Sequence, residues 1–305
     1  METLLNHKKD DVLRSLLQKA VRRSQLFILL ETMNQLIKNN DQDFLIKRLP
    51  VILFEEAWHL ANVIELDENI DNVLNNYIRI CLSYKNKKIA GLASLYDIIV
   101  SKHFLLDDSH SREDYDYISE VFDNTKGSIG GDFYFNNLCR VAKEQGASSL
   151  FLKNCMIARK NANLFHDELY PIIALNVFIE DKHIPEEKHI GEEDVLKFPF
   201  WIAIDKHTKK GKETITEAAN KLRINPEKAL AVSFWLEGGN CYPQMYSRWY
   251  DKAVQHKMKS IGYTLEQARQ IWEQLSPLIK HSLDKESKKL EKVMMKKVIG
   301  YNFEE

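Results

Sequence analysis

The apolar residues of this chain recur at helical spacing along most of its length. Between residues 10 and 38 they stand three or four positions apart, which places them on one face of a helix. We therefore expect an all-α protein. The same period predicts further helices over residues 43–62, 67–84, 89–106, 134–146, 148–178, 212–222, 226–237, 245–260, 264–281 and 283–298.

Local signals at the ends of helices agree with this assignment. Asn225, which precedes a proline, predicts a helix cap, and Thr264 with Gln267 predicts a capping box. Pro50 lacks an amide hydrogen, so we expect it to kink its helix or to start a new one. The apolar run 198–205 is too short for its period to distinguish a strand from a helix.

Breaks in the pattern divide the chain into four parts. The first two are helical, and an acidic stretch with a proline and a glycine follows them as an exposed loop or linker. The last part is helical again and contains the basic turn DKHTKKGK. The predicted parts are residues 1–106, 107–179, 180–197 and 198–305.

Composition supports the helical assignment and limits the classes of partner. Only 11 glycines and 7 prolines occur in 305 residues, whereas all-β proteins need many turn residues. The formal net charge of −1 excludes a global positive field. Contact with DNA would therefore need a local basic patch.

The cysteines Cys81, Cys139, Cys155 and Cys241 stand far apart and form no CxxC pair. Neither a zinc site nor a redox motif is indicated, and free cysteines fit a reducing compartment. The N-terminus has no apolar core of a secretory signal, and no stretch of about 18 apolar residues occurs. We therefore expect a cytoplasmic protein without a membrane partner.

No nucleotide-binding motif is present in the sequence. The glycine-rich segment 127–131 lacks both the spacing and the Lys-Ser/Thr pair of a phosphate-binding loop. We interpret it as a connecting loop and expect no cofactor.

Two pairs of polar residues are candidates for catalysis. His166 and Asp167 are adjacent on a predicted helix, and such a pair can help to hold a metal that activates water. Asp205 and His207 could act as an orienting carboxylate and a general base. The alternatives are a surface histidine beside a helix acid and a solvated turn. Because no spacing singles out further ligands, we expect no bound metal.

Basic residues crowd into the segment 205–212 directly after an aromatic apolar run. Lysines that lie this close together can neutralise phosphates, although a solvated turn before a helix is an equal alternative. A second group follows in the aromatic segment 234–252, where Phe234 and Trp249 have the spacing of core residues. The candidate nucleic-acid contacts are Lys206, His207, Lys209, Lys210, Lys212 and Arg248.

The last predicted helix, 283–298, combines an apolar stripe with many lysines. It could lie on DNA or on an anionic membrane surface, or it could be a basic solvated helix packed on its own domain. Its lysines are Lys285, Lys288, Lys289, Lys292, Lys296 and Lys297.

Glu55 and Glu56 stand in an otherwise apolar helix. Adjacent helical residues point about 100° apart, so at most one of them faces the core, and a buried acid needs a partner. Lys47, Arg48 and His59 are near enough in sequence to supply one. A structural ion pair that braces two helices is the favoured interpretation.

Residues 13–61 combine two helical patterns. Residues 19–23, KAVRR, begin the first, and residues 47–61 carry Lys-Arg-Leu, an apolar pair, Glu-Glu and Leu-Ala in that order. This arrangement resembles the helical region that follows the ATPase core in the family of replication-associated recombination protein A. These clamp-loader relatives include the Werner-helicase-interacting ATPase of eukaryotes. Two departures are Glu56 in place of the usual aspartate and Trp58-His59 in place of a glycine step.

The resemblance implies a clamp-loader-collar-like helical domain that further helices extend. In that class the collar joins subunits, and the ATP-binding residues lie in a core outside this pattern, so we expect a homo-oligomer without ATPase activity. Burying each apolar side chain of the collar contributes roughly 1.5–3 kcal/mol, so a neighbouring subunit or the rest of the chain must cover them. The candidate oligomerisation residues are Leu26, Leu29, Leu30, Met33, Leu49, Ile52 and Phe54.

Three functional hypotheses follow from these patterns. The first is a non-ATPase oligomeric protein of DNA replication, recombination or repair that binds DNA or a replication protein. The second is an adaptor or inhibitor that binds a replication or repair ATPase of the clamp-loader type. The third is a metal-dependent phosphoester hydrolase or nuclease at one of the two candidate pairs.

Overall fold

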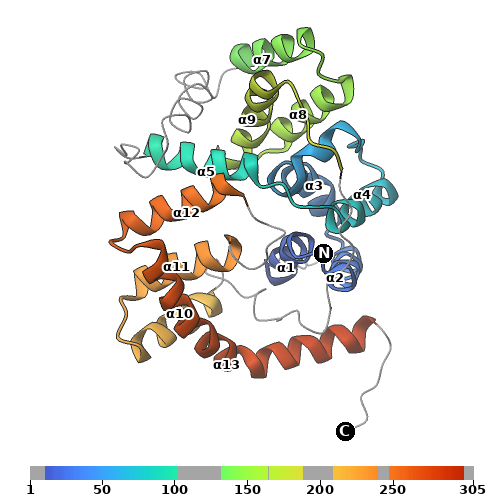
Figure 1. The fold of residues 1–305 in the computed structure, drawn as a ribbon. Helices are drawn as coiled ribbons and strands as arrows, with labels where there is room; N and C mark the ends of the chain where they lie inside the picture. The colour runs from blue at the N-terminus through green and yellow to red at the C-terminus, as the bar shows by residue number, and fades with distance from the viewer. Residues whose placement is uncertain (1–10, 102–131, 164, 188–208, 240–246, 299–305) are drawn as a thin grey trace, which may run out of the picture.

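The structure is a computed structural model, and it describes residues 11–101, 132–163, 165–187, 209–239 and 247–298. These residues form helices throughout and no β-sheet, so the all-α prediction is confirmed (Figure 1). The helices are α1 (Asp11–Arg22), α2 (Leu26–Lys38), α3 (Gln42–Ala57), the 3-10 helix η1 (Trp58–Asn62), α4 (Ile70–Leu82), α5 (Lys88–Ser101), α7 (Asp132–Glu144), α8 (Ser149–Asn161), α9 (Phe165–Asp181), α10 (Lys209–Lys221), α11 (Pro226–Gly239), α12 (Arg248–Ser260) and α13 (Leu265–Val298).

Two helix boundaries differ from the predictions. The single helix expected over 148–178 is two helices, α8 and α9, because Ala162 adopts an extended conformation and ends α8. The two helices expected over 264–298 are one, α13, which continues through Pro277. Helix α3 continues through Pro50, whose neighbours Leu49 and Val51 are buried. Packing on both sides of the proline holds the helix together despite the missing amide hydrogen.

The described helices build two hydrophobic cores. Helices α1 to α5 and α7 to α9 enclose the larger core, and helices α10 to α13 enclose the smaller one (Figure 1). Helix α12 joins the two, since its Trp249 and Ala253 belong to the larger core while its Val254 and Met258 belong to the smaller.

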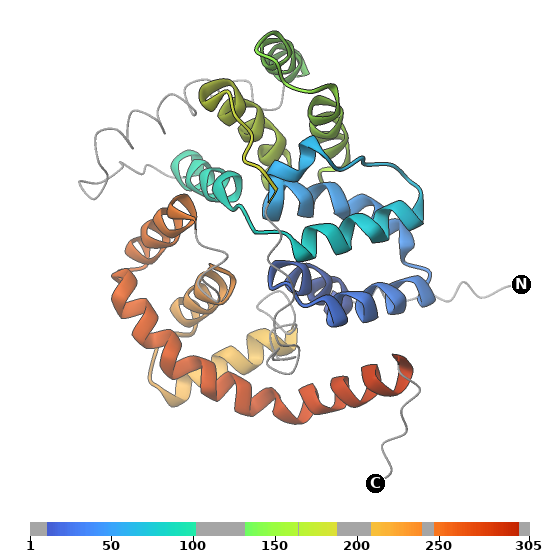
Figure 2. The same ribbon diagram turned by 45° about the vertical axis from the view of Figure 1, so that its right-hand side comes forward.

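Helix α12 packs along α5, a helix of the larger core, and the two backbones approach each other very closely. A Cβ atom added to Gly91 of α5 would stand 2.3 Å from the amide nitrogen of Tyr250 and 2.5 Å from the carbonyl carbon of Trp249. Only glycine leaves room for this crossing. Helix α12 runs alongside α5 from this crossing, and Figure 2 shows the two helices next to each other.

The chain itself covers most of the candidate oligomerisation residues. Of the seven, five are buried in the larger core, Leu26 packs against that core, and Leu30 is 41% exposed. A second subunit is therefore not needed to cover this apolar face, and the homo-oligomer stays a prediction. The buried five are Leu29, Met33, Leu49, Ile52 and Phe54.

Among the described helices, none is both long enough and apolar enough to span a membrane. The ambiguous apolar run 198–205 lies outside the described residues.

Candidate functional site

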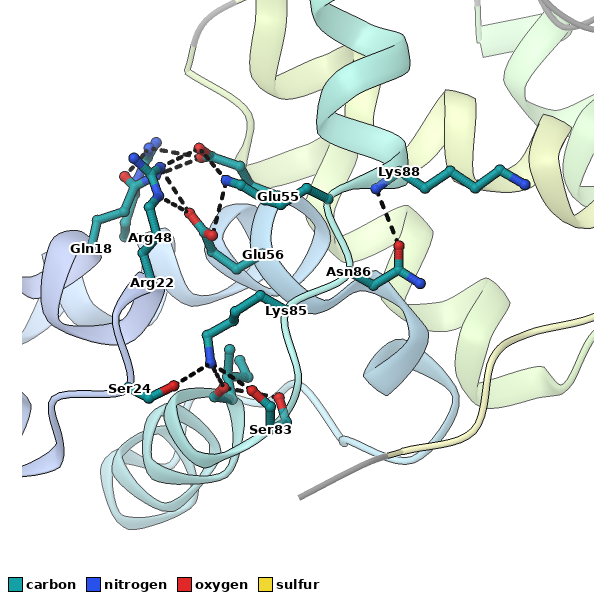
Figure 3. Close-up of polar contacts among 12 residues, drawn as sticks. Gln18, Arg22, Ser24, Arg48, Glu55, Glu56, Ser83, Lys85, Asn86 and Lys88 are labelled. Atoms are coloured by element: carbon teal, nitrogen blue, oxygen red, sulfur yellow. Dashed lines mark hydrogen bonds and ion pairs between the residues drawn. The ribbon is translucent and has the colours of Figure 1, made fainter. Parts of the chain in front are cut away.

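Among the described residues, a concentrated group of charges lies inside the protein, around the end of α3 (Figure 3). Glu56 has a fully buried side chain and forms two ion pairs. Nη2 of Arg22 on α1 lies 2.8 Å from one carboxylate oxygen of Glu56, and Nζ of Lys87 lies 2.9 Å from the other. The predicted structural ion pair is therefore present, but its partners come from residues far away in sequence.

Glu55 extends this network towards α1. Nη2 of Arg22 also lies 2.7 Å from Oε1 of Glu55, and Nε2 of Gln18 donates to Oε2 of Glu55 at 2.6 Å. Arg48, expected as a partner of the acid pair, donates to Gln18 at 2.8 Å and approaches Glu55 only to 3.9 Å. It also pairs with the buried Asp167 at 3.4 Å. The network thus braces α1, α3 and α9 together.

Two buried lysines, Lys85 and Lys87, lie where the sequence indicated a solvated turn. Residues 85–88 have the composition of an exposed polar turn, yet Lys85 is fully buried and Lys87 is 2% exposed. The segment between α4 and α5 is extended there, and Asn86 forms an isolated parallel bridge with Ala57 of α3. The two lysines reach different partners: Lys87 pairs with the carboxylate of Glu56, whereas the ammonium group of Lys85 lies at the end of α4.

The ammonium group of Lys85 caps the end of α4. It donates to the carbonyl oxygens of Ile80, Cys81 and Ser83 at 2.7–2.9 Å, and to the hydroxyl of Ser24 at 3.3 Å. A cation is favoured at this position by the negative end of the helix dipole. Lys85 thus donates hydrogen bonds to carbonyl oxygens that have no partner within the helix and would otherwise bind water.

The charges set the protonation state of Glu56. Burial alone would raise the pKa of its carboxyl, but the charges of Arg22 and Lys87 outweigh burial and lower the pKa to about 2. Glu56 therefore stays ionised at neutral pH and is poorly suited to proton transfer there. Among the described ion pairs, the three cations Arg22, Arg48 and Lys87 face the three acids Glu55, Glu56 and Asp167, so the formal charges of these six residues balance. The arrangement suits a network that holds helices together.

The candidate catalytic pairs divide between this network and undescribed parts of the chain. Asp167 is 5% exposed and pairs with Arg48, which makes it a structural residue here. His166 belongs to α9, but its side chain is not among those described, and Asp205, Lys206 and His207 also lie outside the described residues. Within the described part of the chain, no group of three or more histidines, cysteines and acids could hold a metal ion.

The remaining basic candidates stand at the beginnings of two helices. Lys209, Lys210 and Lys212 occupy the first turn of α10, which carries no acid. The Lys209 side chain is 92% exposed, and Lys212 is also exposed. Arg248 is exposed at the start of α12, with its guanidinium 4.7 Å from the ring centre of Trp249. Trp249 itself is 7% exposed, in keeping with its expected place in the core.

Acidification should weaken the fold between about pH 6.5 and 4 because of His59. This histidine is 3% exposed, and neither ring nitrogen has a hydrogen-bond partner among the described residues. Burial lowers its pKa from 6.5 to about 4, and Lys85 adds to the effect while Glu187 opposes it. In that window the unfolded chain binds a proton that the folded chain does not. The free energy of unfolding should fall by up to about 1.4 kcal/mol per pH unit for this group.

Urea unfolding of the wild-type chain and of His59→Gln at pH 7.5, 5.5 and 4.5 would measure this contribution. The carboxylates titrate alike in both proteins, so the difference between the two curves reports His59. We expect the variant to have the flatter pH dependence above pH 4.5. Parallel curves would contradict the assignment.

Comparison with known proteins adds no relative to this picture: no family model matches the chain, and neither does any curated protein or solved structure.

Proposed function

We propose that this chain is a non-ATPase helical protein of DNA replication, recombination or repair, and that it binds the phosphate backbone of DNA. The proposal joins two features that point the same way. One is the resemblance of residues 13–61 to the collar of clamp-loader relatives. The other is the group of lysines in the first turn of α10. A homo-oligomer belongs to the same proposal, through the collar resemblance alone.

The first turn of α10 carries the argument. Lysines at this end of a helix lie next to the positive end of the helix dipole. Each lysine there destabilises the helix by roughly 0.3–1 kcal/mol. The only described ion pair among them is between Lys209 and Glu213, at 3.9 Å between two exposed side chains, and such pairs contribute little. Exposed lysines and helix amides at one place form a favourable environment for a phosphate.

The start of α12 supplies a second cationic group. Lys252 lies 5.7 Å from the ring centre of the same Trp249 that Arg248 covers, so two cations share one indole. Burial and the nearby Arg248 lower the pKa of Lys252. Because the indole is buried, contact with DNA at this point would rest on charge and not on base stacking.

Binding to single-stranded, forked and duplex DNA at several salt concentrations tests the proposal. We expect the chain to bind at low salt and to lose affinity as salt rises. Replacing Lys209, Lys210 and Lys212 together by alanine should lower the affinity at 0.1 M salt roughly tenfold or more. It should also reduce the salt slope by about 3, one for each lost phosphate contact.

The matched control removes the same charge elsewhere. Lys38, Lys143 and Lys160 are exposed on α2, α7 and α8, and their triple alanine variant should bind DNA like the wild type. An equal loss in both variants would show that net charge alone matters. Absence of binding at low salt to all three DNAs would overturn the DNA proposal. The adaptor hypothesis, which needs no DNA contact, would then be tested by recovery of a replication or repair ATPase with the chain.

A further inference from the structure

Two turns between the C-terminal helices meet at one end of the smaller core. The first joins α10 to α11 and the second joins α12 to α13, and they comprise residues 222–225 and 261–264. Lys228 links them, since its Nζ lies 4.8 Å from the ring centre of Tyr263 and 3.5 Å from a Cβ atom added to Gly262. Figures 1 and 2 both show the two turns at the left edge of the molecule.

Cations outnumber acids where these turns meet. We define the turn surface as residues 220–228 and 257–266. It contains five cations and two acids, which gives a formal charge of +3, whereas the whole chain carries −1. The acids, Glu227 and Glu266, are both exposed. Four of the cations have no ion pair with another described residue: Lys221, Arg223, Lys228 and Lys257.

Arg223 is the cation that the stability of the fold does not explain. It is exposed, and its φ of 57° lies in the left-handed region that glycine adopts freely but that is unfavourable for a residue with a Cβ atom. The other cations do contribute to the fold. Lys221 and Lys257 stand in the last turns of α10 and α12, where the helix dipole favours a cation, and Lys228 lies on the ring of Tyr263. Arg223 thus stands among charges that the fold holds in place.

The apolar side chains of the turn surface are used by the protein's own core. Those on both turns and at the start of α13 pack against the smaller core: Leu222, Ile224, Ile261, Tyr263 and Leu265. A protein partner would therefore find few apolar contacts here, and exposed ion pairs by themselves contribute little. A polyanion whose binding depends on charge alone fits this surface better.

The position of the turn surface suits a DNA duplex that also meets the lysines at the start of α10. Helix α10 has 13 residues, so its two ends lie about 18 Å apart. Over that length a duplex presents about ten negative charges at one per 1.7 Å. We infer that the turn surface, with Arg223 at its centre, is a second contact for the phosphate backbone of duplex DNA. This inference rests on the proposed function, which places the first contact at the start of α10.

The substitution Arg223→Gly removes the central charge while the fold is retained. Glycine adopts a positive φ without steric conflict, and this gain offsets the greater freedom of glycine in the unfolded chain. The melting temperature should therefore stay close to that of the wild type. Adding Lys221→Gln and Lys228→Gln removes two further charges, and glutamine has a helix propensity similar to that of lysine. We call the triple replacement the turn variant.

Binding of the full chain to a duplex of random sequence is then measured at several salt concentrations. We expect the turn variant to bind at least tenfold more weakly at 0.1 M salt and to reduce the salt slope by two or more. Arg223→Gly alone should reduce the slope by about one, and Arg223→Lys should leave the slope unchanged. The triple alanine variant of Lys38, Lys143 and Lys160 removes the same number of charges elsewhere and should bind like the wild type.

The outcomes separate this inference from the proposed function. Unchanged DNA binding by the turn variant and by Arg223→Gly, with a loss in the α10 variant, would overturn the turn surface and leave the proposed function standing. Equal losses in the turn variant and in the control would also overturn it, because net charge would then be the cause. A loss in both the turn and α10 variants would support two contacts on one duplex. No binding by the wild type would overturn both proposals.

A labelled poly-glutamate peptide serves as the probe for an acidic protein segment. We expect the wild type and the turn variant to bind it equally weakly. If the turn variant lost binding to the peptide but kept its affinity for DNA, the turn surface would belong to an acidic protein partner, and its assignment to DNA would be wrong.

Discussion

Replacing Glu56 by glutamine should lower the free energy of unfolding by about 3–5 kcal/mol, because breaking a buried ion pair leaves uncompensated charge inside the protein. Glutamine keeps the shape of the side chain but removes the negative charge that faces Arg22 and Lys87. Both cations are largely buried, and water cannot easily take the place of the carboxylate. Urea and thermal unfolding would measure the loss.

Glu65→Gln is the matched control for this substitution. Glu65 pairs with Lys153 at 2.8 Å, but both side chains are about half exposed or more. Its loss should therefore cost less than about 1 kcal/mol. The double variant Glu56→Gln with Lys87→Met should recover part of the stability, since it removes the buried cation whose nearest carboxylate is lost. If Glu56→Gln cost no more than the control, the network would not be the brace that its geometry indicates.

Gly91→Ala should weaken the packing of α12 against α5, where the helices of the larger core meet those of the smaller core. Cβ atoms essentially never approach other heavy atoms within 3.0 Å, and here the nearest atoms are backbone atoms of α12 at 2.3 and 2.5 Å. Helix α12 must therefore move away from α5. Alanine favours a helix over glycine by up to about 1 kcal/mol, but the displaced packing should cost more, for a net loss of about 1–3 kcal/mol.

Hydrogen exchange of the α12 amides and the melting temperature would report this change. Movement of α12 would also withdraw Tyr250, whose ring centre lies 5.5 Å from the ammonium group of Lys87. Gly146→Ala serves as the control, because a Cβ atom there meets no other atom and only the positive φ of 95° is strained. It should leave exchange in α12 unchanged. Equal exchange in α12 for wild type and Gly91→Ala would refute the close crossing.

The sequence by itself determined that the described residues are helical and where several helices begin, although not how residues 148–178 and 264–298 divide into helices. The cap at Asn225 is present, since its side chain accepts from the amides of residues 227 and 228. The capping box of Thr264 and Gln267 is present in both directions. Such features depend on residues three or four positions apart, so a local pattern contains all the information that they need.

The sequence also identified the exposed lysines of α10, but it could not show where in the helix they stand. That Lys209 and Lys212 stand in a first helical turn that carries no acid follows from where α10 begins. Likewise, only the structure shows that residues 265–298 form one helix, α13, which continues through Pro277.

Only the tertiary structure decided which charges are buried. Glu56 finds its partners 34 residues before it and 31 residues after it, and Lys85 and Lys87 stand in a segment that has the composition of a solvated turn. Local sequence shows a charge but not the partner that can compensate for its burial. Whether a lysine lies in water or inside the protein depends on carboxylates and carbonyls that other helices bring to it, and their arrival is a property of the packed fold.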